Sequence, residues 1–405
     1  MRAGKTAIFV LLVLVLLMVP AAYTMLEELA AQEMLAQNRS SRNRNQPPSN
    51  SNSRHREIAA RASRIISSAD IDIKILVAQV FLTAVDGRET IPERTRQLLT
   101  EIPAGGVILF GYNLGPNSEQ TRAYIEELSR CISDVTFVPF IATDQEGGAV
   151  QRFRGNAALP PPLSYWERLR GMENQNNAVD TVISSVEEEA AVSGRELRRI
   201  GVTMNLAPVA EILTTENMPF LGNRSYGPDQ NFTIRASAAF IRGMERAGIA
   251  STLKHFPGNT AADPHYHRAV LTISEAELER KIRPFRELIH LEAPAVVMVS
   301  HVIVPTWDTI PLSRSTVAVR KLREMGFNGI IMSDDFAMVA AGASPEVSVV
   351  EALAAGVDMI IVWPRDIRRT YQAVLAALET GELSEARIRE AAERVIYQKI
   401  RYGLM

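Results

Sequence analysis

Two adjacent carboxylates stand at the end of an apolar run in the carboxyl-terminal part of the chain. Asp334 and Asp335 follow Gly329–Met332, a run that reads as a buried strand. A carboxylate in such a place can attack the anomeric carbon of a sugar or stabilise the positive charge that develops there. An aspartate after a strand also often caps the next helix. We therefore predict that Asp334 is a nucleophile and that Asp335 supports it or caps the following helix.

A short loop carries a carboxylate and an imidazole on either side of a proline, at Asp263, Pro264 and His265. A carboxylate that accepts a hydrogen bond from one ring nitrogen fixes the tautomer of the histidine. The other ring nitrogen can then exchange a proton with a glycosidic oxygen. The loop also contains His267, and a His-x-His pair beside an aspartate can bind zinc. We favour the acid/base function and predict no metal, because no further ligand set is evident.

Two basic residues directly follow another apolar run. Lys254 and His255 follow Ala250–Leu253, where an unpaired cation would be costly to bury. A clamp for sugar hydroxyls explains them, and so does an ion pair of Lys254 with Asp144 or Glu146; the two explanations are compatible. His301 follows a further run, and a single histidine at such a place is often only hydrogen-bonded.

The elements that must position these residues alternate between short apolar runs and amphipathic segments. The runs are near-continuous in hydrophobicity, as in parallel strands covered on both faces. They are Ile75–Leu82, Gly106–Phe110, Phe137–Ala142, Val202–Leu206, Ala250–Leu253, Ala295–Val299, Gly329–Met332 and Asp358–Val362. Between two of them, Ser274–Glu277 forms a capping box before a helical stripe of Leu278, Ile282, Phe285 and Ile289. Eight strand–helix alternations predict an α/β fold of the (β/α)₈ TIM-barrel type.

Polar residues follow five successive strands of this predicted barrel, from the third to the seventh. Function in such barrels gathers at the carboxyl ends of the strands, so these side chains should meet in one site. The sequence contains neither G-x-G-x-x-G nor G-x-x-x-x-G-K, so a phosphate-cradling loop is not expected.

At these positions the chain resembles glycoside hydrolase family 3, in its single-domain β-N-acetylglucosaminidase branch. The matching stretches are ATDQEGGAVQRF at 142–153, NLAPVAEI at 205–212, LGNRSYG at 221–227, KHFPG at 254–258 and SDDFAM at 333–338. They keep the order of the family, and the resemblance extends from about Ile73 to Leu404.

The resemblance implies a retaining double displacement without a cofactor. It implies that Asp334 is the nucleophile and that His265, paired with Asp263, is the acid/base. The sugar-binding positions of the family carry over to Asp144, Arg224, Lys254 and His255, with His301 as a neighbour of the sugar.

The expected activity is exo-hydrolysis of terminal β-linked N-acetylglucosamine from peptidoglycan or chitooligosaccharide fragments. In this chain the loop after KHFPG is shorter than is usual in the family and has Pro264 where serine is common. Two alternatives therefore stay open: a sugar-binding cell-wall protein of the same fold with impaired catalysis, and a β-glucosidase or β-xylosidase.

The amino-terminal segment has the pattern of an export signal. Arg2 and Lys5 precede an apolar run from Ala7 to Val19, which small residues follow. We predict a signal peptide or membrane anchor at 1–24, a flexible polar linker at 25–56 and one catalytic barrel at 57–405. The protein is then exported to a periplasmic or other extracytoplasmic space, where residues 7–22 could attach it to the cytoplasmic membrane.

The composition limits the range of partners. The chain has 44 Lys and Arg against 46 Asp and Glu, and this balance gives no general attraction for nucleic acid. Its single cysteine, Cys131, excludes an intrachain disulfide and a cysteine-based zinc cluster, and we expect a buried thiol. The expected partner is a carbohydrate, and nothing in the sequence specifies an oligomeric state.

Overall fold

The computed structural model describes residues 48–132, 137–172 and 175–405. The predicted signal or anchor at 1–24 and the linker as far as residue 47 lie outside the described residues. Helix α2 spans Pro48–Ile66, so residues 48–56 are helical where we predicted a flexible linker. Ile58, Ala62 and Ile66 are four residues apart, so they lie on one face of the helix. All three side chains are buried in the core, which stabilises the carboxyl-terminal half of α2.

Residues 58–405 form one compact unit built on a closed barrel of parallel strands. The barrel strands are β1 (Phe81–Ala84), β2 (Gly106–Leu109), β3 (Phe140–Thr143), β6 (Met204–Asn205), β7 (Ala250–Phe256), β8 (Val296–Val299), β9 (Ile330–Asp335) and β10 (Met359–Val362). Strand β1 pairs with both β2 and β10, which closes the ring. The predicted (β/α)₈ barrel is confirmed.

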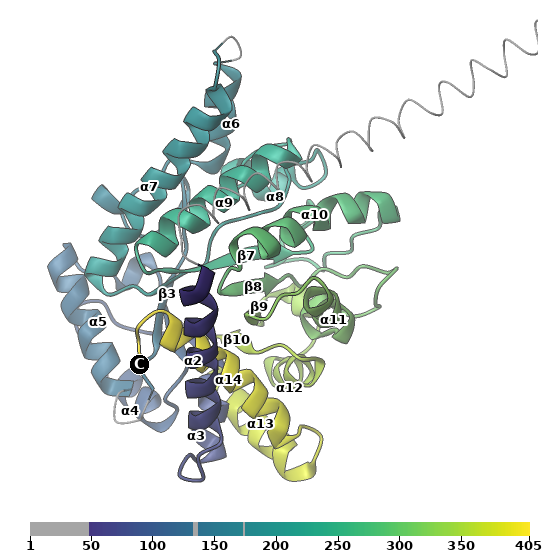
Figure 1. Cartoon of the computed structure of the whole chain (residues 1–405). Helices are drawn as coiled ribbons and strands as arrows, with labels where there is room; N and C mark the ends of the chain where they lie inside the picture. The colour runs from purple at the N-terminus through teal and green to yellow at the C-terminus, as the bar shows by residue number, and fades with distance from the viewer. Residues whose placement is uncertain (1–47, 133–136, 173–174) are drawn as a thin grey trace, which may run out of the picture. The chain divides into compact units, whose positions relative to one another are not determined.

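The helices lie outside the ring of strands (Figure 1). After α2 they are α3 (Ile73–Gln79), α4 (Glu93–Glu101), α5 (Ser118–Ile132), α6 (Pro162–Arg170), α7 (Ala178–Ile200), α8 (Met218–Leu221), α9 (Gln230–Arg246), α10 (Glu275–Glu292), α11 (Thr316–Glu324), α12 (Pro345–Ala355), α13 (Ile367–Thr380) and α14 (Glu385–Arg401). A short hairpin of β4 (Gln145–Gly147) and β5 (Val150–Gln151) follows β3. One apolar cluster takes side chains from all eight barrel strands and fills the interior of the ring.

The first predicted strand is wrong over most of its length. Residues of Ile75–Leu82 form the end of α3 before β1 begins at Phe81. Asp72 caps this helix by accepting a hydrogen bond of 2.9 Å from the N–H of Lys74. From Leu76 onward the segment is buried, and a fully buried apolar run does not reveal its period.

The predicted helix after Ser274 is confirmed. Helix α10 begins with the capping box of Ser274 and Glu277, and the stripe that starts at Leu278 is buried. Cys131 is a buried free thiol, as expected. Among the described helices, none is both long enough and apolar enough to cross a membrane.

Candidate active site

Strand β9 extends further than the apolar run predicted, and its last two residues are Asp334 and Asp335. The Asp334 carboxylate borders a cavity at the carboxyl end of the barrel and accepts a hydrogen bond of 2.9 Å from the N–H of Asp335. Burial acts to raise the pKa of Asp334. The neighbouring His255 and His301 rings outweigh this effect, so the pKa lies below its ordinary value. Asp334 is therefore ionised near neutral pH, as a nucleophile requires.

Hydrogen bonds fix both the side chain and the backbone carbonyl of Asp335. Its carboxylate accepts hydrogen bonds from the N–H of Ala337, at 2.8 Å, and from the indole N–H of Trp363. Burial raises its pKa. Its backbone carbonyl accepts from Nε2 of His301, at 2.9 Å, while Nδ1 of that ring lies 2.6 Å from the hydroxyl of Ser313. Both ring nitrogens of His301 thus have protein partners, and Asp335 and His301 support the strand that carries Asp334.

A cluster of charges lies across the cavity from this strand. Nζ of Lys254 contacts Asp144 at 3.0 Å and Glu146 at 2.7 Å. Arg224 binds Glu146 through two parallel hydrogen bonds of 2.8 and 2.9 Å, and Arg152 contacts Asp144 at 3.2 Å. The structure therefore brings together the predicted residues Asp144, Arg224 and Lys254, and the predicted ion pairs of Lys254 are confirmed.

Glu146 is the centre of this cluster and has no exposed side-chain surface. Burial acts to raise its pKa, but Lys254 and Arg224 hold the pKa at about 2. Burial also opposes the charge of Lys254, yet its carboxylate neighbours raise the pKa of that ammonium. The glutamate, which also borders the cavity, fixes two cations. Its neighbours Asp144, Lys254 and Arg224 border the same cavity and can exchange hydrogen bonds with sugar hydroxyls.

His255 is oriented by a buried carboxylate. Its Nδ1 lies 2.7 Å from Glu211, which also accepts from the N–H of Asn259 at 2.6 Å and from its side-chain amide at 2.8 Å. Burial would raise the pKa of Glu211, but His255 and Asn259 lower it. This contact leaves Nε2 of His255 for the cavity, which the ring borders. Because Asn259 begins the loop after KHFPG, Glu211 also fixes the start of that loop.

The predicted acid/base pair forms in that loop. Nδ1 of His265 lies 2.7 Å from an oxygen of Asp263, and the same oxygen accepts the backbone N–H of His265 at 3.0 Å. Burial acts to raise the pKa of Asp263, and the bonds from His265 outweigh it and lower the pKa. His265 borders the same cavity as Asp334 although its side chain is 54% exposed.

Two backbone hydrogen bonds hold the short loop against the segment that follows β9. The carbonyl of Pro264 accepts from the N–H of Ala340 at 3.0 Å, and the carbonyl of His265 accepts from Val339 at 3.4 Å. This loop clip, formed by residues 264–265 and 339–340, ties the acid/base loop to the segment that continues from the nucleophile strand. The shorter loop thereby reaches the cavity that Asp334 borders.

The zinc alternative finds no geometric support. Within the described ranges, no three His, Cys, Asp or Glu side chains are arranged to hold a metal ion. Asp263, His265 and His267 therefore do not form a ligand set in this structure.

Several residues at the cavity were not predicted from the sequence. Arg152 and the aromatic side chains of Phe110 and Trp363 border it, and Glu211 orients His255. Glu211 belongs to the NLAPVAEI stretch, which was a usable signal, whereas Phe110 and Trp363 look like ordinary strand ends. The cavity has a volume of about 470 Å³, within the range of small-ligand pockets.

Comparison with known proteins places these features among glycosidases. The model of the glycosyl hydrolase family 3 N-terminal domain matches residues 71–397. The chain is 30% identical over 311 residues to a beta-hexosaminidase of Vibrio cholerae, covering 76% of this chain and 88% of that protein. It is 34% identical over 300 residues to a beta-hexosaminidase of Tolumonas auensis, covering 72% and 84%.

Solved structures are also similar. A glycoside hydrolase family 3 beta-N-acetylglucosaminidase from Paenibacillus sp. superimposes with a TM-score of 0.73 and 29% identity, over 82% of this chain and 63% of that one. A beta-N-acetylhexosaminidase from Beutenbergia cavernae gives a TM-score of 0.71 and 25% identity, over 83% of this chain and 100% of that one.

Proposed function

The chain belongs to glycoside hydrolase family 3, and we propose that it is a retaining, exo-acting β-N-acetylhexosaminidase that removes terminal β-linked N-acetylglucosamine. One observation carries this proposal: Asp334, the Asp263–His265 pair and the charged clamp of Asp144, Lys254 and Arg224 all meet at one cavity. The names of the similar proteins support the N-acetylated sugar.

In the first step the terminal sugar lies against the clamp and His255, with its anomeric carbon facing Asp334. The carboxylate attacks that carbon while protonated His265 gives its Nε2 proton to the glycosidic oxygen. The bond to the leaving group breaks, and a covalent glycosyl-enzyme remains. Asp263 stabilises the charged imidazole and keeps Nε2 directed away from its own carboxylate.

In the second step neutral His265 takes a proton from water as the oxygen of the water attacks the anomeric carbon. The bond to Asp334 breaks, its carboxylate is restored, and the sugar leaves with its β-configuration retained. The half-exposed position of His265 suits this exchange with solvent.

The sugar-binding alternative with impaired catalysis is less well supported, because the short loop brings His265 to the cavity. We also propose that the enzyme acts outside the cytoplasm on peptidoglycan or chitooligosaccharide fragments, which rests on the export pattern of residues 1–24. The mass of the mature amino terminus would distinguish a cleaved signal from a retained anchor.

The test is hydrolysis of 4-nitrophenyl N-acetyl-β-glucosaminide by the full chain, beside the matching glucoside and xyloside. We expect turnover of the N-acetylated substrate, loss of turnover in Asp334→Ala, and a β-anomer as the first product in an NMR time course. Faster hydrolysis of the glucoside or xyloside would favour the β-glucosidase or β-xylosidase alternative. Binding of N-acetylglucosamine without any turnover would instead establish the sugar-binding alternative.

A further inference from the structure

Three aromatic rings form a parallel stack at the carboxyl end of the barrel. Phe110 directly follows β2, Tyr112 lies in the short 3-10 helix η1 (Gly111–Asn113), and Trp363 directly follows β10. The rings of Phe110 and Trp363 have centroids 5.3 Å apart at an angle of 10°, and those of Phe110 and Tyr112 have centroids 5.7 Å apart at 13°. Strands β2 and β10 flank β1 in the barrel, so the stack spans the end of β1.

The stack connects the cavity with the surface. Phe110 and Trp363 border the cavity that contains Asp334 and His265, whereas Tyr112 is 49% exposed. A ring that leaves half of its surface in water recovers only part of the free energy of burial. The outer ring therefore contributes little to the core. An exposed aromatic ring that stacks on a ring bordering a sugar site suggests a ligand.

Hydrogen bonds fix the two rings of the stack that border the cavity. The indole N–H of Trp363 donates to the carboxylate of Asp335. On the other side, buried Asn113 accepts from the N–H of Phe110 at 2.9 Å and donates to the carbonyls of Val85 and Gly87, at 2.9 and 2.8 Å. Because the rings are fixed in advance, a ligand that binds to them loses less free energy to ordering the protein.

The stack also adjoins the charged clamp. The guanidinium of Arg152 lies 5.4 Å from the centre of the Phe110 ring and contacts Asp144. A sugar seated in the clamp and a group lying on the rings would therefore be neighbours. A pyranose in a β-linked glycan presents a flat face of C–H groups, which packs well on an aromatic ring.

We propose that the stack of Trp363, Phe110 and Tyr112 is the binding surface for the leaving-group sugar, the pyranose on the far side of the bond that is cleaved. This inference rests on the proposed function, and it makes Tyr112 a determinant of glycan length rather than of catalysis. The surface takes the second sugar of a β-linked N-acetylglucosamine oligomer. Tyr112, which does not border the cavity, makes no contact with a free monosaccharide in the clamp.

The experiment compares sugars of two lengths in the full-chain protein. Michaelis constants are measured for the β-1,4-linked dimer and trimer of N-acetylglucosamine, and inhibition constants for the free monosaccharide. Tyr112→Ala is the test variant and Tyr112→Phe keeps the ring. Val192→Ala, on the outer surface of α7, is the matched control because Val192 is also partly exposed, at 41%. Calorimetric binding of the same sugars to Asp334→Ala, with and without Tyr112→Ala, removes turnover from the comparison.

We expect Tyr112→Ala to weaken the use and binding of the dimer by about 3- to 10-fold, the usual range for one aromatic contact. Inhibition by the monosaccharide should change by less than about 2-fold, and Tyr112→Phe should behave as the unchanged protein. An equal loss for both sugars, or no loss for the dimer while the unchanged enzyme hydrolyses it, would overturn the inference and leave the proposed function intact. If neither sugar is bound nor hydrolysed, the proposed function fails and the inference fails with it.

Discussion

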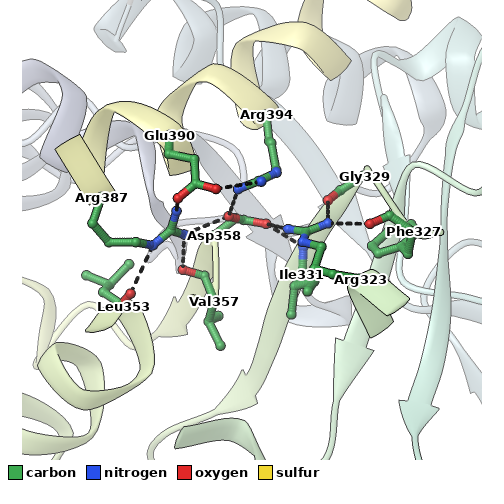
Figure 2. A network of polar contacts seen from close by, with 10 residues as sticks. All are labelled: Arg323, Phe327, Gly329, Ile331, Leu353, Val357, Asp358, Arg387, Glu390 and Arg394. Carbon is green, nitrogen blue, oxygen red and sulfur yellow. Dashed lines mark hydrogen bonds and ion pairs between the residues drawn. The ribbon is translucent and has the colours of Figure 1, made fainter. Parts of the chain in front are cut away.

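The barrel has a cluster of buried charges at each end of its strands, and the two clusters differ in what surrounds them. At the amino end, Asp358 immediately precedes β10, and its side chain is fully buried. It lies at the centre of the network of polar contacts in Figure 2. Its oxygens accept from Arg387 at 2.7 Å, Arg394 at 3.0 Å and Arg323 at 2.6 Å, and from the N–H of Ile331 at 3.0 Å.

The arginines of this amino-end network are themselves held by the protein. Arg323 donates to the carbonyls of Phe327 and Gly329, both at 2.8 Å, and Arg387 donates to the carbonyl of Leu353 at 3.0 Å (Figure 2). The network therefore ties α11, α12, α14 and the starts of β9 and β10 together. The hydrogen bonds of Asp358 and of these arginines are made to other groups of the protein.

At the carboxyl end, Glu146 is the central carboxylate of its cluster, as Asp358 is of the other one. Lys254 and Arg224 form ion pairs with it. The difference is that Asp144, Lys254 and Arg224 border a cavity. Two clusters of similar composition thus have different uses: the closed one stabilises the fold, and the open one can exchange its contacts for those of a ligand. The predictions below test this division.

The largest effect is expected for Asp334→Asn, beside the open cluster. The substitution keeps the shape of the side chain and removes the nucleophilic charge, so kcat should fall by about 10³-fold or more. Thermal unfolding should stay near that of the unchanged protein, because Asp334 borders a cavity rather than filling a core. A large loss of stability together with activity would show that the carboxyl end also holds the fold.

Asp358→Asn should have the opposite pattern. Removing the central carboxylate takes away the acidic partner of Arg323 and leaves Arg387 and Arg394 only the half-exposed Glu390, at 2.6 and 2.7 Å. We expect a loss of about 3–5 kcal/mol in the free energy of unfolding. Denaturant titration measures it, and kcat should be unchanged in the folded protein. Asp180→Asn is the control, since Asp180 pairs with Arg235 at a position where its side chain is 68% exposed. Reduced kcat with normal stability would contradict the division.

His265→Ala tests whether the short loop at the open end of the barrel supplies the general acid. General acid catalysis should be lost, so hydrolysis of the N-acetylglucosamine dimer falls by about 10²-fold. A 2,4-dinitrophenyl glycoside should lose much less, because its leaving group needs no proton. His267→Ala is the matched control from the same loop. Equal losses for both leaving groups would mean that His265 has a structural function only.

Lys399→Met probes the amino end through the pH dependence of stability and should leave kcat unchanged. Lys399 on α14 is fully buried, its Nζ donates to Gln79 at 2.6 Å, and burial lowers its pKa from 10.5 to about 7. Between these values the unfolded chain binds more protons than the folded one, so this group makes stability rise as pH increases from 7 to 10.5. Unfolding of the unchanged protein should show that rise relative to Lys399→Met, with a slope of up to about 1.4 kcal/mol per pH unit. The exposed Lys74→Met should not change the pH profile, and parallel profiles for all three proteins would refute the prediction.

Much of the fold could be predicted from the sequence because buried parallel strands leave a simple pattern. Seven of the eight apolar runs contain a barrel strand at nearly the predicted place. The first run, Ile75–Leu82, was misread because burial on every side removes the difference between helical and strand periods. The start of α2 was missed because its polar first half resembles a linker.

The site divides in the same way. The identities of Asp334, Lys254, His255 and Asp144 at strand ends were readable because a barrel brings all carboxyl ends to one face. Glu211 was missed as the partner of His255, since the two residues are distant in the sequence. Arg152 was missed as the partner of Asp144 because the β4–β5 hairpin that brings them together was not predicted.

The sequence by itself determined the barrel and the chemistry at the ends of its strands, because strand period and residue type are local properties. Only the tertiary structure decided that the short loop reaches the cavity, through the clip of residues 264–265 and 339–340. It alone also decided that Phe110, Tyr112 and Trp363 stack, and that one charged cluster is closed while the other is open. These properties depend on the distance between segments that are far apart in the chain, and no local pattern of residues encodes that distance.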